Sequence, residues 1–136
     1  MLEPLERMEL FTNDRIILDL CGGTGSWSQP YREAGYDVRI VDSLVNGQDV
    51  RLFELPEFPV HGILAAPPCT HLAASGARWW AEKGEDKLFE ALSIADACLR
   101  LVWACKPVWW ALENPVGRLS RFYGQPKMYF DPRKGC

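Results

Sequence analysis

The chain has 136 residues, 48% of them hydrophobic, and a formal net charge of −3. This length predicts one domain, 1–136, and the acidic charge argues against a broad electrostatic contact with nucleic acid, which needs clustered lysines and arginines. Five cysteines without a C-x-x-C pair argue against a disulfide framework and a zinc ribbon, and favour a reducing compartment. No signal peptide or membrane-spanning run is recognisable, so we expect a cytoplasmic protein without a membrane partner.

The first half of the chain predicts a βαβ unit. Residues 16–20 are a short apolar run that reads as a buried strand, and the glycine-rich turn Cys-Gly-Gly-Thr-Gly follows it. Ser26 or Ser28 is suited to cap a helix that ends before Gly35, and residues 37–42 predict the next strand. Such units build parallel sheets with a right-handed crossover.

The second half continues the alternation of helices and strands. Residues 43–60 give a weak signal, whereas 61–66 predict a third strand that stops at two prolines. Residues 85–105 have apolar side chains at three- and four-residue steps and predict the longest helix, and 108–112 predict a fourth strand. A helical turn is expected within 119–123. The fold class is therefore α/β, a mostly parallel sheet with flanking helices.

Polar or conformationally special residues follow every predicted strand. In an open parallel sheet the carboxyl ends of the strands form the ligand-binding edge. The sequence therefore predicts a site at this edge, made by Asp19 to Gly25, Asp42, Pro67-Pro68-Cys69 and Glu113-Asn114-Pro115.

The glycine turn allows two interpretations. Gly22, Gly23 and Gly25 let the backbone approach a ligand closely, or they serve only a tight strand–helix connection. Their spacing matches neither a dinucleotide fingerprint nor a phosphate loop. The turn, the helix and then Asp42 after the second strand look like the S-adenosylmethionine (AdoMet)-binding half of a class I methyltransferase, in which Asp42 would hold the ribose hydroxyls.

Cys69 is either a small core residue or a nucleophile. The prolines fix the backbone before it and it lies at a strand end, which favours the second interpretation. A reactive thiolate also needs nearby positive charge or hydrogen-bond donors, for which His71 and Arg78 are candidates close in sequence. Glu113, at the end of an apolar strand, is either a capping or salt-bridging residue or a general acid.

Together, D-L-C-G-G-T-G at 19–25, A-P-P-C at 66–69 and E-N-P at 113–115 resemble the DNA cytosine-5 methyltransferases, a family with a Rossmann-like class I methyltransferase fold. The resemblance implies methyl transfer from AdoMet to C5 of cytosine in DNA, with S-adenosylhomocysteine as the product. It implies that Cys69 attacks C6 and that Glu113 contacts N3. The implied cofactor residues are Asp19, Cys21, Gly22, Gly23, Gly25, Asp42, Asp49 and Pro67, and the implied substrate residues are Pro68, Asn114 and Arg78.

The chain also departs from the family pattern. Cys21-Gly22 replaces the usual Phe and small residue, and Thr70 replaces the usual Gln. The Q-x-R-x-R motif, the target-recognition region and the closing strands are not recognisable, as expected for a minimal, phage-like or truncated member acting in a bacterial or phage-infected cell. A partner chain or a further C-terminal segment would then supply the rest. Two alternatives stay open, a non-catalytic AdoMet-binding module and a methyltransferase acting on RNA or a nucleotide.

Overall fold

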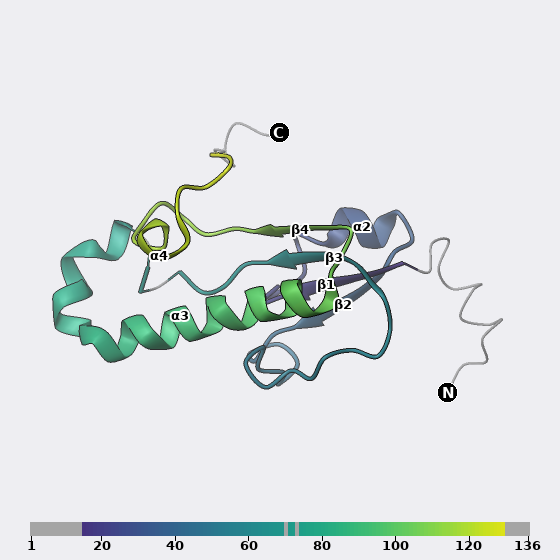
Figure 1. The fold of residues 1–136 in the computed structure, drawn as a ribbon, viewed down its shortest axis with the longest axis horizontal. Coiled ribbons are helices and arrows are strands. Elements are labelled where there is room, and N and C mark those ends of the chain that lie inside the picture. Colours follow the sequence, from purple (N-terminus) through teal and green to yellow (C-terminus); the bar gives the residue numbers. More distant parts are fainter. Residues whose placement is uncertain (1–14, 70, 73, 130–136) are drawn as a thin grey trace.

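Four parallel strands form the centre of the protein. The structure, a computed structural model, describes residues 15–69, 71–72 and 74–129. The strands are β1 (Ile16–Leu20), β2 (Asp37–Val41), β3 (Val60–Ala65) and β4 (Trp109–Leu112), in the spatial order β2-β1-β3-β4 (Figure 1). Their bounds lie within one residue of the predicted ones. The predicted α/β class with a parallel sheet is confirmed.

One face of the sheet is covered by the long helix α3 (Trp80–Cys105), which runs beside the strands in Figure 1. Gly84 interrupts it with φ 73° and ψ −179°, so the regular part begins at Glu85, where the apolar periodicity predicts it. Lys106 ends the helix in the left-handed conformation, and its N–H donates to the Val102 carbonyl at 3.1 Å. Pro107 follows and prevents the helix from continuing.

The main core lies between α3 and this face of the sheet. Alternation along each strand turns every second side chain toward the helix. The buried residues that share this core are Ile16, Leu18, Leu20, Val41, Val50, Val60, Ile63 and Ala65, with Ala97, Cys98, Leu101 and Val102 from α3.

The opposite face carries the short helix α2 (Gln29–Glu33) and a group of aromatic rings. Tyr31 stacks on Trp109 of β4 with ring centroids 5.2 Å apart. Gly62 of β3 makes room for that indole, because a Cβ at this position would overlap the Trp109 ring. The aromatic packing therefore ties the helix of the βαβ unit to the last strand of the sheet.

The connections hold two shorter elements. The 3₁₀ helix η1 (Ala74–Trp79) precedes α3, and α4 (Ser120–Tyr123) forms the helical turn expected near residue 120. Within 43–60, where the sequence gives a weak signal, residues 50–52 form a turn. No helix within the described ranges is both long and apolar enough to cross a membrane.

Candidate active site

The carboxyl ends of β1, β2, β3 and β4 meet at one edge of the sheet, and the hydrogen-bond ladder continues beyond the strands. The Cys21 N–H donates to the Val41 carbonyl at 2.7 Å, and the Ala66 N–H donates to the Leu20 carbonyl at 3.0 Å. The Glu113 N–H donates to the Ala65 carbonyl at 2.8 Å. These bonds hold the segments after the strands in fixed register.

The glycine turn after β1 depends on unusual backbone conformations. Cys21, Gly23 and Gly25 have φ values of 58°, 57° and 82°. A left-handed backbone conformation is strained for a residue with a Cβ, so it destabilises the fold at Cys21 but not at the two glycines. Gly22 is required for a different reason, since a Cβ there would overlap the carboxylate of Asp19.

Asp19 lies beneath this turn rather than in contact with solvent. Its side chain is fully buried, and Oδ2 accepts a hydrogen bond from the Ser28 hydroxyl at 2.5 Å. Ser28 occupies the N-cap position of α2, as the sequence allows. Its hydroxyl is directed to Asp19, however, and forms no cap hydrogen bond with the helix, contrary to the prediction. Burial raises the pKa of Asp19, and the Ser28 hydrogen bond and the charge of Arg32 offset part of that effect.

Asp19 also keeps one unused acceptor. Its Oδ1 is buried and has no hydrogen-bond partner among the described residues. An unpaired buried acceptor is costly, and a donor from a ligand or from a bound water would satisfy it.

Asp42, after β2, organises the backbone around it. Its Oδ2 accepts the Gly23 N–H at 2.9 Å, which joins the end of β2 to the glycine turn. Its Oδ1 accepts the N–H groups of Leu44 and Val45 at 2.9 and 3.2 Å. A carboxylate oxygen has more than one acceptor direction, so Oδ2 still has room for a ligand hydroxyl.

Asp49 faces Arg51. The guanidinium contacts both carboxylate oxygens, with Nη2 2.7 Å from Oδ2 and Nε 3.0 Å from Oδ1. These hydrogen bonds hold the pKa of Asp49 below its ordinary value. Arg100 of α3 fixes the same segment by donating to the Phe53 carbonyl at 2.8 Å.

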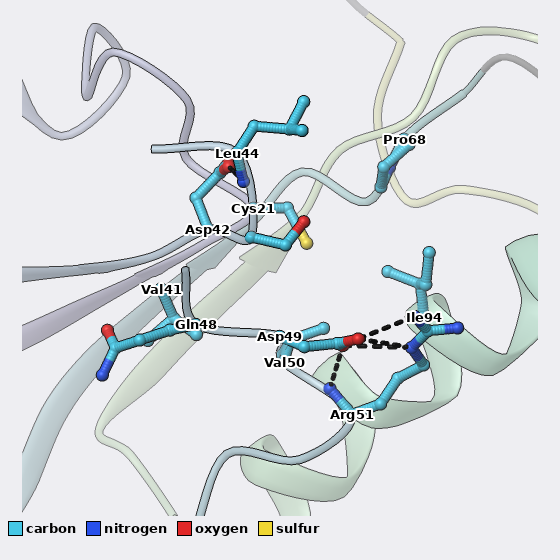
Figure 2. A pocket seen from close by; sticks show the side chains of 11 residues that line it. Cys21, Val41, Asp42, Leu44, Gln48, Asp49, Val50, Arg51, Pro68 and Ile94 are labelled. Carbon is cyan, nitrogen blue, oxygen red and sulfur yellow. Dashed lines mark hydrogen bonds and ion pairs between the residues drawn. The ribbon is translucent and has the colours of Figure 1, made fainter. Parts of the chain in front are cut away.

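A small pocket lies between the ends of β1 and β2, the 48–51 segment and α3 (Figure 2). Four of the predicted site residues line it: Cys21, Asp42, Asp49 and Pro68. Val41, Leu44, Val50 and Ile94 give it apolar walls. Its volume of about 100 Å³ is below the roughly 300 Å³ of a typical ligand pocket, so it suits one ring system of a larger ligand.

Cys21 has a contact that the sequence did not suggest. Figure 2 shows its sulfur between Asp42 and Pro68. Cys21 packs against the main core, to which the fully buried Cys98 of α3 belongs. The Cys98 thiol lowers the pKa of Cys21, against the opposing effects of burial and of the nearby carboxylates.

The Pro-Cys and Glu-Asn segments are joined directly. The Asn114 amide Nδ2 donates to the Pro67 carbonyl at 3.0 Å, while the Glu113 backbone binds Ala65. Pro67 is buried, Pro68 is exposed, and Cys69 and Glu113 are half-buried. The structure thus brings the two segments side by side, with the nucleophile candidate two residues after the bonded proline.

The two candidates for activating Cys69 are placed differently. Arg78 is exposed and lies over the ring of Trp79, with Cζ 4.9 Å from its centroid. His71 has its pKa lowered, first by burial and then by the charges of Lys83 and Lys87, so its imidazole is neutral at neutral pH. Within the described part of the chain, neither side chain forms a hydrogen bond with Cys69.

Sequence reasoning missed Arg118. Its Nε donates to the His71 carbonyl at 2.9 Å, its backbone N–H donates to the Leu72 carbonyl at 2.8 Å, and its guanidinium lies 4.5 Å from the centroid of the Trp80 ring. It therefore fixes the segment after Cys69 to the segment after Glu113. An arginine close behind the Glu-Asn-Pro motif was the available signal.

Comparisons of this chain with protein families, with curated proteins and with solved structures found no match.

Proposed function

We propose that this chain is the catalytic core of a DNA cytosine-5 methyltransferase, which transfers a methyl group from AdoMet to C5 of cytosine through a covalent adduct with Cys69. The hydrogen bond from Asn114 to the Pro67 carbonyl carries the proposal, because it joins the two motifs that would supply the nucleophile and the acid. Contacts between motifs far apart in sequence are stronger support than either motif alone.

The fold agrees with this proposal at a coarser level. Four parallel strands in the order β2-β1-β3-β4 place the glycine turn and the Pro-Cys segment on neighbouring central strands. A cytosine-5 methyltransferase with this fold needs that adjacency, because the methyl donor and the nucleophile must both reach the same cytosine ring.

The pocket residues fit part of AdoMet. The apolar side chains of Val41, Val50 and Ile94 suit a flat base, and the Asp42 carboxylate beside them suits ribose hydroxyls. Asp49 would contact the base edge only through acceptor directions that Arg51 leaves free. The remainder of the ligand would lie over the glycine turn, above the unpaired Oδ1 of Asp19.

The chemistry assigns separate roles to two side chains. AdoMet supplies an activated methyl group. The Cys69 thiolate attacks C6 of the cytosine, and Glu113 stabilises the developing charge by a hydrogen bond or a proton at N3, which makes C5 nucleophilic. Loss of the C5 proton and release of Cys69 restore the enzyme. A cytosine in duplex DNA must be flipped out of the stack to reach these groups.

Substrate recognition would require more than the described residues. β4 is an edge strand of the described sheet, and Trp103, Val108 and Trp110 beside it are 68%, 77% and 44% exposed. Exposed aromatic residues at a strand edge are suited to pairing with another segment. A further C-terminal segment or a partner chain would cover them and supply contacts to DNA.

A covalent trap tests the catalytic proposal. DNA containing 5-fluorocytosine should form a denaturation-resistant adduct in the presence of AdoMet, because fluorine at C5 blocks the elimination step. Cys69→Ser should abolish the adduct, and Cys105→Ser, which changes a half-buried cysteine at the end of α3, should retain it. Catalysis at Cys69 would be refuted if the folded wild-type chain formed no adduct, either alone or together with the further segment or partner chain that contacts DNA.

Two further measurements separate the alternatives. Calorimetric titration with S-adenosylhomocysteine should show binding that Asp42→Ala weakens; binding without an adduct would support a non-catalytic AdoMet-binding module. Labelled methyl transfer should then be compared among duplex DNA, single-stranded DNA, RNA and free nucleotides. Single-stranded and small substrates are included because a chain with a net charge of −3 has little electrostatic attraction to duplex DNA.

A further inference from the structure

Three unpaired nitrogen atoms lie on residues that Arg118 joins. They are Nη2 of Arg118, Nε1 of Trp80 and Nδ1 of His71, and each is buried without a hydrogen-bond partner among the described residues. A buried polar atom without a partner destabilises the folded state. A ligand that bonded these atoms would offset that cost.

The guanidinium of Arg118 is held in one orientation by two contacts. Its Nε donates to the His71 carbonyl at 2.9 Å, and its Cζ lies 4.5 Å from the centroid of the Trp80 ring. The free N–H groups of Nη2 and of the Trp80 indole therefore belong to two groups in direct contact. The arrangement is a pair of fixed donors rather than a single mobile side chain.

The chemistry of these donors selects an anion. A guanidinium and an indole N–H donate hydrogen bonds and accept none, and the guanidinium keeps its positive charge at any ordinary pH. Its planar fork matches the oxygens of a phosphate or a carboxylate. The site therefore suits an oxyanion, and neutral His71 can donate to it when the Nδ1 atom carries the imidazole proton.

The site adjoins the segment of the proposed nucleophile. The Leu72 N–H donates to the Cys69 carbonyl at 2.9 Å, so His71 lies within the turn that follows Cys69. On the other strand end, Asn114 precedes Arg118 by four residues and bonds the Pro67 carbonyl at 3.0 Å. An anion at Arg118 would thus lie near the group that Cys69 attacks.

We propose that Arg118 and Trp80 bind a phosphate group of the substrate, next to the cytosine that Cys69 attacks. The preference for an oxyanion follows from the donors themselves, whereas the assignment of the phosphate to the substrate rests on the proposed function. A nucleotide and a nucleic-acid strand both carry this group, and a free base or nucleoside does not. A single local contact agrees with the net charge of −3, which argues only against a broad one.

Binding at this site requires a local movement. The two donor atoms are shielded, although Arg118 and Trp80 are only half-buried as whole residues. Gly84, with φ 73°, separates residues 80–83 from the regular part of α3. The Trp80 indole can therefore shift without unwinding the long helix, and its N–H should report the arrival of an anion.

Nuclear magnetic resonance of the full chain tests the site directly. The indole N–H signal of Trp80 is identified by its absence in Trp80→Phe, and that of the exposed Trp103 by its absence in Trp103→Phe. Inorganic phosphate, added at constant ionic strength, should shift the Trp80 signal in a saturable way and leave the Trp103 signal unchanged. A Trp80 signal that does not respond, or that responds equally to chloride, would overturn the proposal.

Two variants test the donors. Trp80→Phe keeps a ring beneath the guanidinium but removes the indole N–H, and Arg118→Gln removes the charge. Each should weaken phosphate binding by about tenfold, as expected for the loss of a charged hydrogen bond. Arg121→Gln, which changes the net charge equally on the exposed side of α4, should weaken it less than about twofold. Equal losses in Arg118→Gln and Arg121→Gln would refute a specific site. Because Arg118→Gln also loses a fold contact, Trp80→Phe gives the deciding result if that variant does not fold.

The source of the phosphate is tested with three ligands. Deoxycytidine monophosphate and a single-stranded oligodeoxycytidine should each bind about tenfold more tightly than deoxycytidine, and Trp80→Phe should reduce that advantage. An advantage for the oligonucleotide alone assigns the site to a strand, and an equal one for both assigns it to the single nucleotide. Equal affinities for all three ligands would refute the assignment to the substrate. If no adduct forms at Cys69, the proposed function fails, while the response of Trp80 to inorganic phosphate still tests the anion site.

Discussion

The amide of Asn114 donates a hydrogen bond to the Pro67 carbonyl oxygen across 47 positions of sequence, at 3.0 Å. Nδ2 is thereby satisfied, whereas Oδ1 of the same side chain is buried without a partner in the described part of the chain. An acceptor that is buried and unpaired destabilises the folded state, so a donor from a ligand would offset this cost. This combination favours a role in which Asn114 positions the Pro-Cys segment and keeps one acceptor for a ligand.

Asn114→Ala should therefore weaken both the fold and the site. Removal of the donor leaves the carbonyl of the buried Pro67 unpaired, which should lower the free energy of unfolding by about 1–2 kcal/mol. Urea denaturation measures this loss, and the yield of the 5-fluorocytosine adduct measures the effect on Cys69. Asn114→Gln, which keeps the amide, is the control that should retain more of both. Equal adduct yields in wild type and Asn114→Ala would contradict the positioning role.

Two neighbouring glycines provide a matched pair of substitutions. Gly22→Ala should lower the free energy of unfolding by about 3 kcal/mol, because its Cβ overlaps the Asp19 carboxylate, which Ser28 holds in place. Gly23→Ala should lower it by only about 1–2 kcal/mol, because nothing lies near the added Cβ and only its φ of 57° is strained. Chemical denaturation of both variants tests the ranking, and a larger loss for Gly23→Ala would contradict it.

Asp19 predicts a pH dependence of stability. Its pKa is raised above the ordinary value of 3.8 by burial, so the folded state holds a proton that the unfolded state has released. The contribution of Asp19 protonation to the stability of the folded state is therefore complete below pH 3.8. It is lost as the pH rises through the pKa of Asp19 in the folded state.

Asp19→Asn, which does not titrate, isolates this effect. The free energy of unfolding of the variant, relative to that of wild type, should rise as the pH is raised above about 4 and should level off once wild-type Asp19 is ionised. Ser28→Ala serves as the comparison, because it removes the hydrogen bond that offsets burial and should extend the dependence to higher pH. A difference that does not vary with pH would refute the assignment.

The sequence predicted the strands because each is a short apolar run that ends at glycine, proline or an acid. Since parallel strands share one edge, the strands also predicted that Asp42, Cys69 and Glu113 lie near one another. The packing of Cys21 against the core that contains Cys98 could not be predicted this way, because it depends on how α3 crosses the sheet. Periodicity shows which side of a helix is apolar but does not fix which residues it brings to a given strand end.

Side-chain partners were the least predictable features. Ser28 is one of the two serines suited to cap the helix, yet its hydroxyl donates to the buried carboxylate of Asp19 and forms no cap hydrogen bond with the helix. Asp49 was expected to contact a ligand, and in the structure its carboxylate is held by Arg51, two residues away. Its contact with the cofactor stays a prediction. These choices depend on burial and on competing partners, which a linear pattern does not encode.

Arg118 provides the last prediction, because it connects the segment after Cys69 to the segment after Glu113 without belonging to either motif. Arg118→Lys keeps the charge but loses the planar group that bonds the His71 carbonyl and stacks on Trp80, so unfolding should become easier by about 1–2 kcal/mol and adduct formation at Cys69 should slow. Arg121→Lys, on the exposed side of α4, should change neither quantity.

A quenched time course of adduct formation at saturating DNA distinguishes slower chemistry from weaker binding. Because the backbone N–H of residue 118 still bonds Leu72 in the variant, the segments remain adjacent and only their alignment is tested. Wild-type adduct rates in Arg118→Lys would show that this arginine stabilises the fold without positioning Cys69.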